Sequence, residues 1–230
     1  LRYVYHRTTL PFERTTILYG PTGSNKSSFL FWLYWLFRTG GGKWPTPHGK
    51  YLHLGVEDKD SPLLRLSLTD YDDSAGWVKE CASLNEFQEQ VKTFLDWFKS
   101  FMSKGPGRRI PLMIGVDSLV AKMTTAAAKV VDKSHGETGR RFADEARALK
   151  DWYMYMPNML RSWPVHLVGV NHDKPKPGEH GRPEQHHTPG GASPNYYATY
   201  KILLQRVKKL DETASGWQGN RIKFKMEKNS

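Results

Sequence analysis

The feature that most constrains this chain is a glycine-rich segment between two apolar runs. Residues 20–27 read GPTGSNKS; they follow an apolar run at 16–19 and precede a second at 29–33. This order predicts a strand, a tight loop and a helix. The spacing from the first glycine to Lys26 and Ser27 is that of a phosphate-binding P-loop, so the expected ligand is a nucleoside triphosphate.

In such a loop the backbone N–H groups and the helix N-terminus face the phosphates, Lys26 neutralises β/γ oxygens, and the Ser27 hydroxyl reaches Mg²⁺. The expected cofactors are therefore ATP and Mg²⁺. We expect the nucleotide to be bound by Gly20, Pro21, Thr22, Gly23, Ser24, Asn25, Lys26, Ser27 and Ser28.

Asn25 departs from the P-loop pattern, because it stands where the pattern has the glycine before lysine. Asparagine tolerates left-handed backbone angles better than most residues, so the loop can still close. The alternative interpretation is a chance Gly/Ser-rich turn before a helix.

Further apolar segments alternate in type along the chain. We expect strands at 51–56, 111–116 and 165–170, helices at 84–102 and 142–156, and edge strands at 200–207 and 221–226. Strands that alternate with helices predict an α/β fold with a mostly parallel central sheet, helices on both faces and an antiparallel edge.

Length and composition favour one domain spanning residues 1–230. No apolar run is long enough to span a bilayer, and Cys81 is the only cysteine, so a cytoplasmic setting is expected. The chain begins without Met and ends directly after an apolar strand. We therefore expect it to be the core of a longer protein.

The charge is unevenly distributed. The net charge is +11, with 15 Lys and Arg against 12 Asp and Glu in residues 1–120, and 19 against 11 in residues 121–230. A basic second half indicates a polyanionic partner, most simply nucleic acid. The alternative is an ordinary solvated surface.

Two carboxylates follow predicted strands. Asp117 is placed as a Walker B carboxylate, which would hold Mg²⁺ beside Ser27. Glu57 is placed to orient or deprotonate an attacking water. The alternatives are a strand-end aspartate that caps a turn and a surface glutamate in an acidic turn that also contains Asp58 and Asp60.

Asn171 and His172 end the strand predicted at 165–170. A polar side chain here can contact the γ-phosphate and move when it leaves, so His172 is a candidate catalytic residue that couples hydrolysis to the next loop. The alternative is a structural histidine.

Two polar segments, 121–138 and 173–191, are candidate DNA-binding loops, because basic loops at strand ends can clamp a phosphate backbone. The alternatives are solvated loops or, for the second segment, a histidine metal site. The basic residues expected to contact DNA are Lys122, Lys129, Lys133, Arg140, Lys174, Lys176 and Arg182.

The order of these motifs resembles that of the RecA-type strand-exchange recombinases, most closely their phage, UvsX-like branch. The resemblance covers nearly the whole chain. It runs from the phosphate loop through Glu57, the pair Asp117-Ser118 and the pair Asn171-His172 to Gly190, Gly191 and Lys228.

This resemblance implies a RecA-like P-loop NTPase core with DNA-dependent ATPase activity. The implied partners are single-stranded and double-stranded DNA and further copies of the chain in a helical filament. Gly190 and Gly191 would close the second DNA-binding loop, and Lys228 would reach a neighbour's nucleotide. The family's usual second basic residue is Ser230 here. We expect the family's N-terminal oligomerisation segment and its C-terminal region to be absent from this chain.

Two other functions fit the same residues. Residues 51–66, which contain Glu57, Asp58 and Arg65, also resemble the plasmid RepA-like helicases. A hexameric RecA-type replicative helicase of this kind would form rings and translocate along single strands. A P-loop protein that lost catalysis through Asn25 would bind DNA or a partner without hydrolysis. A P-loop kinase fits least well, because no lid-like arginine cluster is evident.

Overall fold

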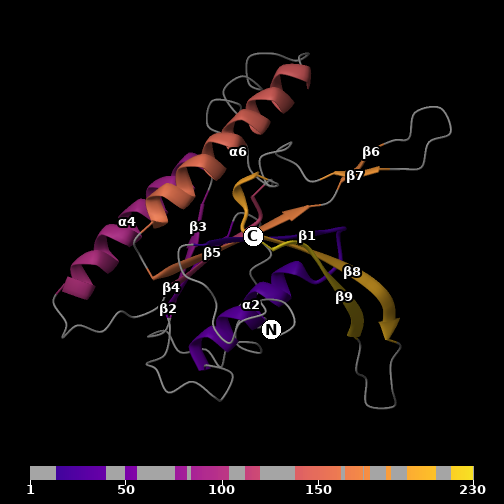
Figure 1. The fold of residues 1–230 in the computed structure, drawn as a ribbon, viewed down its shortest axis with the longest axis horizontal. Coiled ribbons are helices and arrows are strands. Elements are labelled where there is room, and N and C mark those ends of the chain that lie inside the picture. Colours follow the sequence, from indigo (N-terminus) through magenta and orange to yellow (C-terminus); the bar gives the residue numbers. More distant parts are fainter. Residues whose placement is uncertain are drawn as a thin grey trace.

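The computed structural model places a seven-stranded sheet at the centre of the molecule (Figure 1). The structure describes residues 14–39, 50–55, 76–81, 84–103, 112–119, 138–161, 164–172, 174–176, 185–187, 196–210 and 219–229. The strands of this sheet are β1 (Arg14–Gly20), β2 (Lys50–Gly55), β3 (Gly76–Glu80), β4 (Leu112–Asp117), β5 (Val165–His172), β8 (Tyr200–Leu210) and β9 (Gly219–Asn229).

The strand order is β3-β2-β4-β5-β1-β8-β9. The first six strands are mutually parallel, and β9 pairs antiparallel with β8 at the edge. This confirms the predicted α/β class with a mostly parallel sheet and an antiparallel edge.

In the described part of the chain, three helices cover the two faces of the sheet: α2 (Lys26–Thr39), α4 (Leu84–Ser103) and α6 (Thr138–Leu160). From β1 the chain crosses towards the β3 edge, and after β3 it returns through β4 and β5. Because crossovers between parallel strands are right-handed, this reversal places α2 on one face and the other two helices on the opposite face. Figure 1 shows this arrangement.

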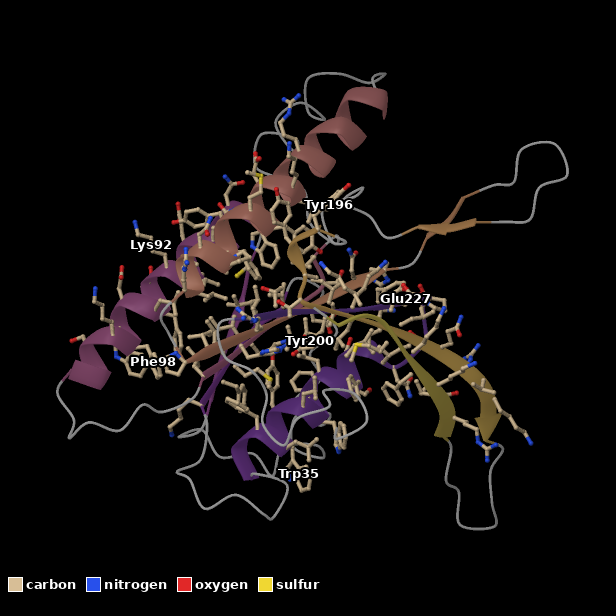
Figure 2. The ribbon with its side chains drawn as sticks, in the orientation of Figure 1. Trp35, Lys92, Phe98, Tyr196, Tyr200 and Glu227 are labelled. Atoms are coloured by element: carbon tan, nitrogen blue, oxygen red, sulfur yellow. The ribbon has the colours of Figure 1, made fainter. Side chains whose placement is uncertain are left out.

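The sheet has one hydrophobic core on each face, and successive side chains of a strand point into opposite cores. Ile17 and Tyr19 of β1 pack with α4 and α6, whereas Leu18 packs with α2. Figure 2 shows Phe98 on α4 and Trp35 on α2 at opposite sides of the sheet. Within the described part of the chain, no helix combines the length and hydropathy that a membrane crossing requires.

The core beneath α2 is strongly aromatic and leaves no room beside Gly115. Tyr34 stacks on Tyr51 with ring centroids 4.5 Å apart, and its hydroxyl lies 3.1 Å from Nδ1 of buried His53. A Cβ atom on Gly115 would overlap that hydroxyl and lie 2.6 Å from Cζ of the same ring. Only glycine fits under Tyr34.

We therefore expect Gly115→Ala to lower the free energy of unfolding by about 1–3 kcal/mol, because Tyr34 is enclosed and cannot move away. Urea denaturation measures the effect. The double variant Gly115→Ala with Tyr34→Phe removes the overlapping hydroxyl and should be less destabilised than the sum of the two single changes. Equal stability of Gly115→Ala and the wild type would contradict this packing.

The sequence interpretation missed three short strands. β3 is five residues long, too short for an alternating pattern to stand out. The segment 173–191, interpreted as a loop, contains the antiparallel pair β6 (Lys174–Lys176) and β7 (Gln185–His187). These strands have three residues each, in a stretch whose Pro, Gly and His content favours a loop.

Candidate phosphate-binding site

Polar groups from separate parts of the chain meet at the carboxyl edge of the parallel sheet. In the β1–β5 ladder Tyr19 pairs with Asn171 and Gly20 pairs with His172. The segment predicted to bind phosphate therefore begins directly beside the pair predicted to sense it. In an open parallel sheet this edge, where the strand order reverses, is the usual place for a ligand.

The loop after β1 turns tightly. Three of its residues have positive φ: Gly20 at 153°, Gly23 at 77° and Asn25 at 57°. A Cβ atom at Gly20 would collide with the carbonyl oxygen of Leu204 on the neighbouring strand, so this glycine is required for close approach. The left-handed conformation expected of Asn25 is confirmed.

Asn25 joins the loop to α2. Its carbonyl accepts the first helical hydrogen bond, from the N–H of Phe29 at 3.0 Å, and its Oδ1 lies 3.4 Å from Nδ2 of Asn220. Left-handed geometry costs most residues about 1–2 kcal/mol, and asparagine and glycine less. The residue that departs from the P-loop pattern thus keeps the backbone that the pattern needs.

Two substitutions of Asn25 separate the effect of its left-handed backbone from the effect of its side chain. We expect Asn25→Ala to lower the free energy of unfolding by about 1–2 kcal/mol, because alanine is strained at φ 57°. Asn25→Gly should retain nearly all of the wild-type stability, since glycine adopts this φ freely. Chemical denaturation of the two variants measures the difference; equal stabilities would contradict the account.

The first residue of α2 is a buried cation. Lys26 is 5% exposed, and its ammonium donates to the carbonyls of Gly20 at 2.9 Å and Pro21 at 2.8 Å. The first turn of this helix contains no acidic residue. A cation next to the positive end of a helix dipole is electrostatically unfavourable, and the loop carbonyls offset part of that cost. A bound anion would interact favourably with both the Lys26 ammonium and the positive end of the α2 dipole.

The residues predicted to hold Mg²⁺ lie on the same edge. Ser27 is half-buried in the first turn of α2, and Asp117 is half-buried at the end of β4, with β5 between β4 and β1. Hydroxyl and carboxylate oxygens are the ligand types that Mg²⁺ takes in proteins, together with nucleotide phosphates and water. The donor set therefore fits Mg²⁺ carried by a nucleotide.

The strand end at Asn171 is packed against α6. Asn171 is fully buried, and its Oδ1 accepts from the backbone N–H of His172 at 2.8 Å. Tyr153 of α6 is also buried, and within the described part of the chain its hydroxyl makes no hydrogen bond of standard geometry. Burial raises the pKa of Tyr153 well above its ordinary value, and the nearby Asn171 side chain opposes that rise.

This pKa shift has a consequence for stability in alkali. The folded protein keeps the Tyr153 proton at pH values where the unfolded chain has begun to release it, near pH 10. The contribution of the buried neutral hydroxyl to the free energy of unfolding is therefore complete below pH 10 and is lost as the pH rises. We expect the unfolding free energy of the wild type to fall faster above pH 10 than that of Tyr153→Phe, by up to about 1.4 kcal/mol per pH unit. Parallel curves would contradict it.

Several predicted site residues lie outside the described residues, and others have only their backbones described. Arg140 is in the first turn of α6, while Lys174 and Lys176 are in β6. Those outside are Glu57, Lys122, Lys129, Lys133, Arg182, Gly190 and Gly191.

The structure does not bring Lys228 to the phosphate loop of its own chain. It pairs with Lys201, which pairs with Ile17, so it lies level with β1 three residues before Gly20. Its ammonium donates to the carbonyl of Tyr196 at 3.2 Å. The predicted contact with a neighbour's nucleotide stays a prediction.

The sequence interpretation overlooked a strongly basic ribbon formed by β8 and β9. Its single acidic residue, Glu227, lies 3.5 Å from Lys201 and 3.6 Å from Lys225. Figure 2 shows the nitrogen-tipped side chains that extend along this ribbon beyond Glu227. Counting charges strand by strand would have found it. The basic residues are Lys201, Arg206, Lys208, Lys209, Arg221, Lys223, Lys225 and Lys228.

No protein family model matches the chain, and no curated protein matches it in sequence. Among the described residues, no three His, Cys, Asp or Glu side chains gather as a metal-binding group.

Proposed function

We propose that this chain is the ATPase core of a DNA-binding motor or recombinase with a RecA-like P-loop fold. The observation that carries the proposal is the loop between β1 and α2. It combines positive φ at Gly23 and Asn25 with the buried ammonium of Lys26 at an acid-free helix start. Backbone N–H groups at a helix start together with a nearby cation are the groups that bind polyphosphate in such loops.

The remaining residues have roles that follow from their positions. Ser27 and Asp117 would hold Mg²⁺, which would neutralise phosphate charge. His172 stands beside Gly20 in the sheet, so it is placed to contact a terminal phosphate. Asn171 fixes the backbone of His172. Glu57, which follows β2, is proposed as the residue that orients the attacking water.

Within this class we propose a recombinase that binds single-stranded DNA, forms a filament and promotes pairing and strand exchange. The motif order resembles the RecA-type recombinases. The β8–β9 ribbon supports a polyanionic partner, because eight of its side chains are basic and one is acidic. Contacts to phosphates are independent of base sequence, as a homology search requires.

The test is ATP hydrolysis with and without single-stranded DNA, with assemblies viewed by electron microscopy. We expect turnover that DNA stimulates, helical filaments, and a loss of activity of about 100-fold or more in Lys26→Ala, because the cation that binds the phosphates is removed. The control is Arg161→Ala, because Arg161 is exposed and lies near the amino end of β5, away from the loop after β1. This variant should hydrolyse ATP at the wild-type rate.

The other outcomes separate the alternatives. Stimulated hydrolysis with closed rings would replace the recombinase by the hexameric helicase. DNA binding without nucleotide binding would exclude an ATPase and leave a DNA-binding protein with an inactive P-loop.

A further inference from the structure

Strand β8 extends beyond the end of β1 and lies along the phosphate loop. The ladder between the two strands ends at Tyr19 and Leu203. The next residue, Leu204, presents its carbonyl to Gly20. Arg206 is three residues past Leu203, which is roughly 10 Å farther along the strand. The β8–β9 ribbon therefore lies along one side of the loop after β1, and we call this side the wall of the loop.

The side chain at the end of this wall is a guanidinium. A Cβ atom built on Gly23 would lie 3.7 Å from Nη1 of Arg206, so the guanidinium adjoins the fourth residue of the loop. From the paired strand, Asn220 reaches Asn25 at 3.4 Å. The hairpin thus meets the loop at Gly20, Gly23 and Asn25.

The charge of Arg206 is available to a ligand. Its side chain is exposed, and no carboxylate of the described residues lies within ion-pair distance of it. A guanidinium has a planar set of donors that matches two phosphate oxygens, and such charge-assisted pairs are stronger than neutral hydrogen bonds. Lys26, by contrast, is held inside the loop by carbonyls.

We propose that Arg206 is a phosphate-binding residue of the nucleotide site, a second cation supplied by the same chain from the outer side of the loop. This inference rests on the proposed nucleotide-binding function and adds a ligand that the P-loop motif does not contain. Lys26 binds the polyphosphate from inside the loop, and Arg206 binds it from the wall formed by β8.

The test is competition against a fluorescent ATP analogue, with Mg²⁺ present and DNA absent, using unlabelled ATP and inorganic tripolyphosphate as the two competitors. We expect Arg206→Ala to raise the Kd of both competitors about 10- to 100-fold, because a charge-assisted hydrogen bond is lost. Arg206→Lys should recover part of this loss, because it restores the charge without the planar fork.

Arg161→Ala is the matched control, since it removes an exposed arginine next to the amino end of β5, away from the loop. It should bind both competitors as the wild type does. Thermal melting of each variant verifies folding, and Arg206 is exposed, so its replacement should leave the melting temperature unchanged.

Three results would overturn the proposal. If Arg206→Ala binds both competitors normally while Lys26→Ala does not, the proposed function stands and Arg206 is no ligand. If Arg206→Ala weakens ATP but leaves tripolyphosphate unchanged, the guanidinium contacts the base or ribose and not the phosphates. If the wild type binds neither competitor, the proposed nucleotide site itself fails, and the role of Arg206 with it.

Discussion

The position of β1 between two parallel neighbours is the constraint on which the rest of the structure depends. Because β5 and β8 run in the same direction as β1, the carboxyl ends of all three strands lie at one edge. The loop after β1 is therefore bounded by His172 on one side and by the continuation of β8 on the other. An antiparallel neighbour in either place would have brought a strand start, and not a strand end, to this edge.

Electrostatics then decides which ligands this edge can bind. The first turn of α2 combines helix-start N–H groups with a buried ammonium and contains no acid. Burial disfavours a charged group without polar partners, and the carbonyls of Gly20 and Pro21 accept hydrogen bonds from the Lys26 ammonium. The guanidinium of Arg206 adds a further positive charge on the open side of the loop. We propose that these two cations favour a polyanionic ligand at this edge.

The sequence predicted this fold well where local signals were long. The apolar runs of β1, β2, β4 and β5 and the periodic spacing along α4 and α6 correspond to the observed elements. Asn25 was predicted to tolerate the left-handed conformation of the glycine that it replaces in the P-loop pattern, and it has φ 57°. Strand β3 was not predicted, because its five residues give too little periodicity to be recognised. Its conformation depends on pairing with β2.

The candidate site was only partly predictable for a related reason. A motif shows residues that are close in sequence, so Lys26 and Ser27 were found at once. Arg206 and Asn220 are far from the loop along the chain, and only the strand order brings them beside it. The pairing of Gly20 with His172 likewise depends on the register between two strands that are far apart in the sequence.

The most direct test of the central claim is a crystal structure of the chain with Mg²⁺ and a non-hydrolysable ATP analogue. The account predicts phosphate density inside the turn formed by residues 20–28, with the Lys26 ammonium turned from the loop carbonyls to phosphate oxygens and Mg²⁺ beside Ser27. Nucleotide density elsewhere on the molecule, with Lys26 still bonded to Gly20 and Pro21, would contradict it.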